Sequence, residues 1–203
     1  MEEKIITLKN LLRSKGIRLL PGLTEEEFLK IEEIYGITFP ADLHMIYENF
    51  IPISKKPRSF YNWHDFSPQN IAHIKKKIFR AYKYFIPYMR PFYKMSLHKD
   101  MDQLTDEALI LTLPQLIPIY GHRFMPASPE DAGNPVFSIV GTDMIYYGSD
   151  IFNYFDLEFA YEPSTKERND AFEAMRLSPV KPIFFWDDML DCHQFGDFDE
   201  DDE

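Results

Sequence analysis

Two sets of side chains could take part in acid–base chemistry. His122 and Arg123, taken with Asp143, could form a pocket in which a carboxylate orients a general base, and His64 with Asp65 offers a second pair. Neither set comes with a recognisable nucleophile or with metal-ligand spacing, and adjacency along the chain does not establish geometry. We therefore expect structural histidines here. An enzyme or small-ligand pocket near His122, Arg123 and Asp143 stays as the less favoured alternative.

Motifs for phosphate, metal or nucleophile chemistry are absent from the sequence. There is no glycine-rich dinucleotide loop, no phosphate-binding Gly-Lys-Ser/Thr run, no His-Glu-x-x-His and no Gly-x-Ser-x-Gly. The single cysteine, Cys192, excludes an internal disulfide and a Cys-x-x-Cys metal site. The sequence thus predicts neither a cofactor nor a metal, and catalysis is the less favoured class of function.

Acidic residues gather at the C-terminal end of the chain. Nine of them lie between residues 187 and 203 and account for most of the net charge of −11. Such a segment repels phosphates and membrane head groups and attracts a basic protein, so we expect no direct nucleic-acid or membrane binding. Asp187, Asp188 and Asp191 are predicted to contact this partner, and residues 191–203 are expected to be a disordered tail.

Aromatic residues make up 16% of the chain, more than a core needs, so some are expected at a contact surface. We predict Tyr61, Trp63, Tyr88 and Tyr93 as contact residues, with a place in the core left open for Trp63. No apolar run approaches a membrane span or a signal segment. Together with the lone cysteine, this favours a soluble, cytoplasmic protein.

Helical spacing and end signals predict four helices in the first half of the chain. The second has the clearest ends, because Thr24 and Glu27 form a capping-box pattern and Gly36 suits the C-terminal stop. The fourth carries many Lys and Arg residues, which we interpret as a solvated face, with docking of the acidic tail as the alternative. The predicted ranges are Glu2 to Lys15, Thr24 to Gly36, Pro40 to Pro52 and Ser67 to Pro87.

Strand signals dominate the second half. Two apolar runs, Val136 to Val140 and Met144 to Tyr147, are separated by Gly141-Thr142 and predict a hairpin. Because the second run is apolar on both faces, we expect the hairpin to be central and Ile145 to be buried. Further strands are predicted in four ranges: Pro57 to Phe66, Ala108 to Leu113, Gln115 to Tyr120 and Pro182 to Leu190.

Helices are also expected after the hairpin. Ile151, Phe155 and Phe159 recur at the spacing of one helix face. Pro163 to Arg176 reads as a helix or a partly mobile connector. Since helix and strand signals are interspersed while hairpins join the strands, we predict one α+β domain, residues 1–190, whose central antiparallel sheet is flanked by helices.

Three segments resemble the SUKH superfamily, which includes fungal cell-wall glucan-synthesis regulators and many bacterial toxin-immunity proteins. The run NPVFSIVGTDMIYYGSDIFNYF, residues 134–155, resembles its C-terminal motif. The run from Gly22 to Phe50 resembles its opening motif, and LIPIYGHRFMP, Leu116 to Pro126, its middle strand pair. The matches follow the family order from Gly22 to about Phe159, while Ser54 to Ala108 shows no family pattern.

The resemblance implies a non-catalytic protein-binding role. In bacterial members this would be an immunity protein that neutralises a cognate toxin, often a nuclease, by direct binding. In fungal members it would be a regulator of cell-wall synthesis that acts through protein contacts. The expected partner is therefore a protein, and the acidic end of this chain favours a basic toxin domain.

Overall fold

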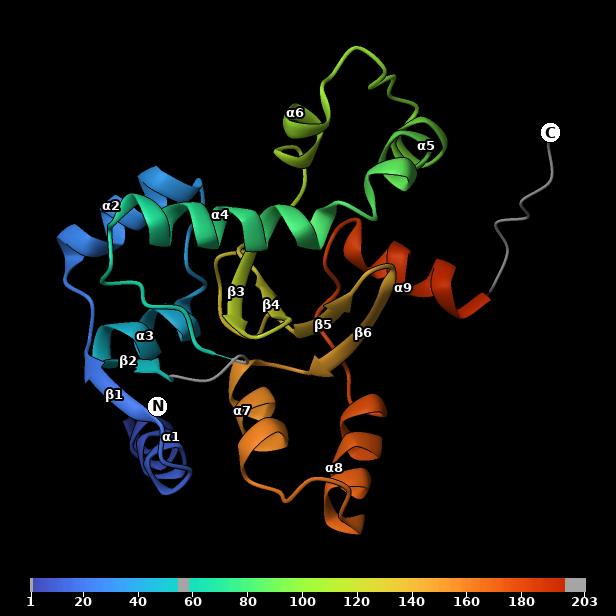
Figure 1. The fold of residues 1–203 in the computed structure, drawn as a ribbon. Helices are drawn as coiled ribbons and strands as arrows, with labels where there is room; N and C mark the ends of the chain where they lie inside the picture. Colours follow the sequence, from blue (N-terminus) through green and yellow to red (C-terminus); the bar gives the residue numbers. More distant parts are fainter. Residues whose placement is uncertain (1, 55–58, 196–203) are drawn as a thin grey trace.

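The computed structural model describes residues 2–54 and 59–195, which form a mixed α+β fold (Figure 1). Four antiparallel strands make the main sheet in the order β3-β4-β5-β6, and β1 pairs with β2 in a second sheet. The strands are β1 (Arg18–Pro21), β2 (Phe50–Ile53), β3 (Leu116–Tyr120), β4 (Arg123–Pro126), β5 (Val136–Val140) and β6 (Asp143–Gly148). The predicted fold class, α+β with a central antiparallel sheet flanked by helices, is confirmed.

Helices cover the main sheet from two sides. In Figure 1, α4 runs across one side while α7 and α8 lie on the other. The helices are α1 (Glu2–Ser14), α2 (Glu25–Tyr35), α3 (Ala41–Asn49), α4 (Pro68–Tyr82), α5 (Ile86–Leu97), α6 (Asp106–Ile110), α7 (Ile151–Phe159), α8 (Lys166–Arg176) and α9 (Trp186–Phe195). Among the described residues, none of these helices is long and apolar enough to cross a membrane.

The main sheet separates two hydrophobic cores because neighbouring strand residues point to opposite faces. Ile117, Met125 and Val136 point into the first core, which is shared with α1, α2, α3 and α7. Phe124 and Phe137, next to Met125 and Val136 in the chain, point into the second core, shared with α5, α6 and α9. Both faces of the sheet are therefore covered, although not along their whole length.

The hairpin β5–β6 forms as predicted, but it is not central. Val140 pairs with Asp143, which leaves Gly141 and Thr142 as a two-residue turn, and Gly141 takes a positive φ of 66° that suits glycine. However, β6 is the edge strand of the sheet. Ile145 is 49% exposed there, so the prediction that it is buried is wrong.

Two segments predicted as strands are helical. Ala108 to Leu113 contains the end of α6, which begins after Thr105, whose side chain accepts a hydrogen bond from the Ala108 backbone. Pro182 to Leu190 leads into α9, in which the acidic Asp187 and Asp188 occupy the favoured first turn. The strand prediction is therefore wrong, and α9 continues through Asp191, the first residue of the predicted tail, to Phe195. The disorder expected for residues 196–203 lies outside the described residues.

The remaining corrections concern the segment between α3 and β3. Of the strand predicted over Pro57 to Phe66, residues 55–58 lie outside the described part, and Phe60 makes an isolated bridge with Tyr120. The helix predicted to end at Pro87 ends at Tyr82, and a separate helix, α5, follows. Pro87 lies in the first turn of α5, where its missing N–H costs nothing.

Candidate functional site

Three of the four predicted contact aromatics are core residues. Trp63 is only 2% exposed, and its ring packs edge-on against Tyr35 and Phe39. Tyr61 is also buried and donates a 2.9 Å hydrogen bond to the Gly121 carbonyl. These residues support the fold, because their rings are not accessible to a partner.

The other two predicted aromatics lie on α5. Tyr93 is buried, and its hydroxyl donates to the side-chain oxygen of Thr112 at 2.7 Å. Tyr88 is half-buried against the second core and so keeps part of its ring accessible. Only Tyr88 of the four can therefore serve as a contact residue in this conformation.

The predicted acidic contact residues all lie on α9. Asp187 is half-buried and accepts a short hydrogen bond from the Tyr146 hydroxyl of β6. Asp188 is exposed. Asp191 belongs to the same helix rather than to a tail. The carboxylate of Asp187 thus helps to hold α9 against the sheet.

The predicted His122–Arg123–Asp143 pocket is not assembled around Arg123. Arg123 is buried, donates to the Ser138 hydroxyl at 2.9 Å and faces Glu158 of α7, with 3.5 Å between Nη2 and Oε2. Its Cζ also lies 3.5 Å from the centre of the Tyr147 ring. Asp143 is exposed at the hairpin turn, and His122 is half-buried. The carboxylate that accompanies Arg123 is therefore Glu158, which the sequence did not indicate.

The second predicted pair, His64 with Asp65, has a structural role. His64 Nδ1 lies 2.7 Å from Glu27 Oε1, and its Nε2 lies 3.0 Å from the Pro21 carbonyl. Partial burial opposes the charged form of His64, but these hydrogen bonds and the charge of Glu27 raise its pKa above the ordinary 6.5. Asp65 instead accepts a hydrogen bond from the Ser67 backbone. The histidine links α2 to the chain that precedes it.

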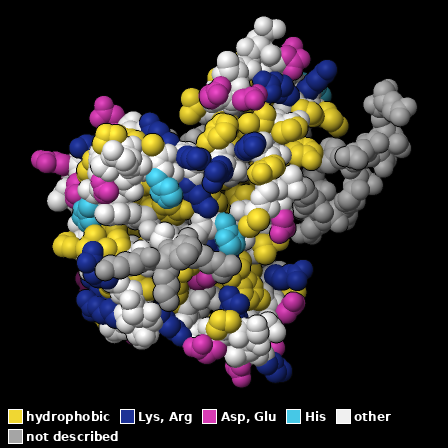
Figure 2. All heavy atoms as spheres, in the orientation of Figure 1, with side chains coloured by type: hydrophobic (Ala, Val, Ile, Leu, Met, Phe, Trp, Pro, Cys, Tyr) yellow, Lys and Arg dark blue, Asp and Glu magenta, His cyan; other side chains and the backbone are white. Residues whose placement is uncertain are grey.

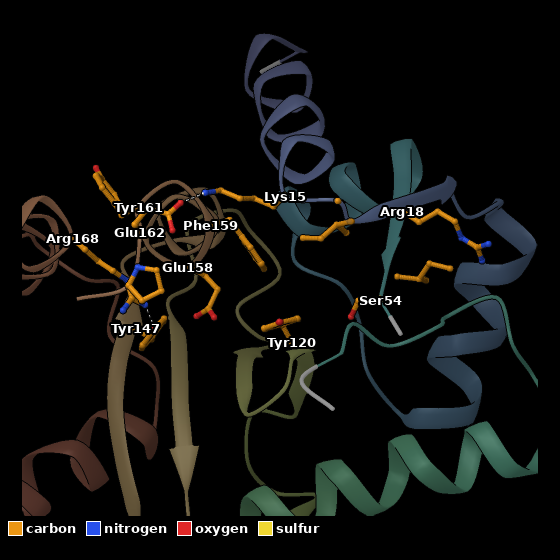
Figure 3. A pocket seen from close by; sticks show the side chains of 14 residues that line it. Lys15, Arg18, Ser54, Tyr120, Tyr147, Glu158, Phe159, Tyr161, Glu162 and Arg168 are labelled. Atoms are coloured by element: carbon orange, nitrogen blue, oxygen red, sulfur yellow. Dashed lines mark hydrogen bonds and ion pairs between the residues drawn. The ribbon is translucent and has the colours of Figure 1, made fainter. Parts of the chain in front are cut away.

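A cleft of about 820 Å3 lies between the α1–β1 connection and the α7–α8 segment (Figure 3). Its wall includes four aromatic rings, Tyr120, Tyr147, Phe159 and Tyr161. Glu158 points into the cleft on the side that faces Tyr120. At its rim, Lys15 and Glu162 form an ion pair of 3.0 Å. We take this cleft as the candidate site because charged groups and aromatic rings converge there.

Three buried polar atoms, one on the cleft-lining Glu158 and two on residues next to it, lack hydrogen-bond partners among the described residues. They are Arg123 Nε, the Tyr154 hydroxyl and Glu158 Oε2, all of them buried. Glu158 and Tyr154 are one turn apart on α7, and burial together with the charge of Glu158 raises the pKa of Tyr154 well above its usual range. Buried polar groups are normally paired. The helical spacing of these two residues was visible in the sequence, but their meeting with Arg123 was not.

Arg168 of α8 forms the other charged part of the cleft. Its Nη2 donates to the Tyr147 hydroxyl at 2.8 Å, and its Nε donates to the Leu157 carbonyl at 3.2 Å. Within the described residues, Arg168 makes no ion pair with a carboxylate. Nor do the described residues gather three or more side chains suited to a metal ion.

Comparisons with protein-family models, with curated proteins and with solved structures found no match to this chain.

Proposed function

We propose that this protein is a non-catalytic binding protein, and that it neutralises a toxin protein by direct contact, as an immunity protein does. The SUKH resemblance of three segments supports this role. The contacts of the predicted acid–base residues support it as well, because His64 is held by Glu27 and Pro21, and Arg123 is engaged by Glu158 and Ser138.

The observation that carries the proposal is an apolar stripe on α5. Pro87, Tyr88, Pro91 and Met95 recur at helical spacing. Pro87 and Pro91 are exposed, Tyr88 is half-buried, and Met95 is 76% exposed. In Figure 2, hydrophobic side chains gather over α5 and the adjoining end of α4, next to the Lys and Arg residues of α4. An exposed apolar surface with an accessible tyrosine is typical of a protein interface.

The position of this stripe in the chain supports a partner-specific role. It lies within residues 54–108, the part that shows no SUKH pattern, whereas the sheet and the helices that resemble the family lie outside it. Residues 86–110 carry three basic and four acidic side chains and are nearly neutral, so the stripe would contribute apolar contact rather than charge attraction. The acidic residues from Asp187 onward would speed the encounter with such a partner, while the stripe would hold the complex.

The experiment is co-purification with a candidate toxin domain, encoded beside this chain, and measurement of the dissociation constant of the complex. Met95→Glu places a charge on the stripe and should weaken binding by about 2 kcal/mol, which is about 30-fold. The matched control is Leu177→Glu, because Leu177 is an 85% exposed apolar residue that follows α8. Equal binding by the two variants would exclude the stripe as the interface, and absence of any complex would contradict the proposed function.

A further inference from the structure

The cleft beside α7 is lined by two opposite charges, Glu158 and Arg168, whose hydrogen-bonding capacity is only partly used by the described residues. Glu158 is only 12% exposed at its side chain, and its Oε2 accepts no hydrogen bond, although Arg123 Nη2 lies 3.5 Å away. Arg168 has a neutral oxygen and a backbone carbonyl as acceptors rather than a carboxylate. Tyr147 connects them, because its ring stacks under Arg123 and its hydroxyl accepts from Arg168.

This arrangement selects against ligands that carry one charge only. A lone cation that approached Glu158 would be repelled by the guanidinium of Arg123, and it would bring no negative charge for Arg168. A lone anion that approached Arg168 would enter the same cleft that the carboxylate of Glu158 lines. A ligand with an ammonium and a carboxylate a few ångströms apart would satisfy both groups without leaving either charge unpaired.

We propose that the cleft binds a free α-amino acid, with its ammonium group on Glu158 and its carboxylate on Arg168. The side chain of the ligand then lies against the apolar wall formed by Ile17, Ile53 and Phe159. A volume of about 820 Å3 accommodates a large side chain. We therefore expect aromatic and branched aliphatic amino acids to bind better than glutamate or lysine.

The Tyr154 hydroxyl supports the part of this assignment that concerns Glu158. It is fully buried one helical turn from Glu158, has no partner among the described residues, and stays protonated because its pKa is raised. A protonated phenol can donate to the carboxylate that receives the ammonium group, and so can hold it in place. The site also shares no residue with the α5 stripe, so it adds to the proposed protein-binding role without depending on it.

The test is calorimetry and thermal denaturation of the full chain with L-phenylalanine and L-leucine at millimolar concentration. Two truncated probes separate the charges: phenylalaninamide keeps the ammonium, and N-acetylphenylalanine keeps the carboxylate. Because a hydrogen bond to a charged group contributes about 1.5–3 kcal/mol, each probe should bind about tenfold more weakly or worse. No binding of either amino acid, or equal binding of a truncated probe, would overturn the proposal.

Two variants locate the site. Glu158→Gln should abolish the preference for phenylalanine over N-acetylphenylalanine, but it also removes the partner of a buried arginine and could unfold the protein. Arg168→Gln leaves that pair intact and should abolish the preference for phenylalanine over phenylalaninamide. Arg176→Gln is the matched control, because Arg176 lies on the same helix and pairs with Glu173 in solvent. If Arg168→Gln binds amino acids as Arg176→Gln does, the cleft is not the binding site.

Discussion

Individual charged residues in this protein act through close partners within the fold, and His64 is the clearest case. Both ring nitrogens face acceptors, Glu27 at 2.7 Å and the Pro21 carbonyl at 3.0 Å. Only the doubly protonated imidazolium can donate to both. Burial opposes the charge of Glu27, but its hydrogen bonds with Thr24 and His64 lower its pKa below the ordinary 4.5. The pair therefore stabilises the folded state only where both residues are charged.

The pH dependence of unfolding should reveal this pair. The raised pKa of His64 gives stability that is fully present below pH 6.5 and is lost as pH rises through the folded-state pKa. The lowered pKa of Glu27 gives stability that is present above pH 4.5 and is lost as pH falls through its folded-state pKa. Urea denaturation should show His64→Gln to be less stable by about 1 kcal/mol between these pH values. A difference that instead grows above pH 8 would rule out the charged pair.

Trp63 tests whether the predicted contact aromatics are core residues. Trp63→Ala should lower the free energy of unfolding by about 3–5 kcal/mol, because it leaves a cavity between Tyr35, Phe39 and Tyr47. Chemical denaturation measures this loss. If the variant kept its stability but released its partner faster, Trp63 would be a contact residue and not a core residue.

At the scale of elements, local signals were read correctly where end signals and periodicity agreed. The ends of α2 were predictable because Thr24, Glu27 and Gly36 act within a few residues of each other, and the capping box is present. The hairpin was predictable from its two-residue turn. The position of β6 at the edge of the sheet was not predictable. Apolar residues on both faces of a strand do not show whether a second strand pairs with its other side. The aromatic run before α9 resembled a strand, although Ile183, Trp186 and Met189 are buried at helical spacing.

The candidate site was predictable only in part for the same reason. Arg123 was singled out from the sequence, but with Asp143 as its expected carboxylate. The residue that faces it, Glu158, comes from a helix that packs on the sheet, so the pair depends on tertiary structure. Arg168 lies on a segment predicted as a helix or a partly mobile connector. Its contact with Tyr147 also depends on tertiary structure.

The capping box gives a prediction for α2. Thr24→Ala removes the acceptor for the Glu27 backbone N–H and should cost about 0.5–2 kcal/mol of stability. Thr24→Ser keeps the hydroxyl and is the control, and thermal denaturation compares the two. Equal losses in both variants would show that the hydroxyl bond contributes nothing.

The edge position of β6 reverses our expectation for Ile145. Because this side chain is half exposed, Ile145→Asp should be folded and lose less than about 1 kcal/mol. Ile139→Asp, on the neighbouring β5, places a charge in the second core and should unfold the protein. Circular dichroism shows whether each variant is folded. An unfolded Ile145→Asp would mean that Ile145 is buried, as the sequence predicted.

At the scale of the whole molecule, the elements packed around the sheet carry three separate surface features. The cleft lies beside α7 and α8, the apolar stripe follows α5, and the acidic residues begin on α9. Most aromatic rings of the described residues are buried in the cores, whereas Phe79, Tyr84 and Phe184 are exposed. Under the proposed function, α5 would contact the partner and the rest of the chain would hold that helix in place.

The most direct test of a non-catalytic role is a titration of toxin activity with this protein. If the protein acts by binding, residual toxin activity should fall in proportion to the amount of protein added and reach its minimum at an equimolar ratio. At each ratio, the residual activity should stay constant with time. Separation of the complex should then return active toxin. Continued loss of toxin activity at substoichiometric amounts would mean that one molecule inactivates many, which would contradict the binding account.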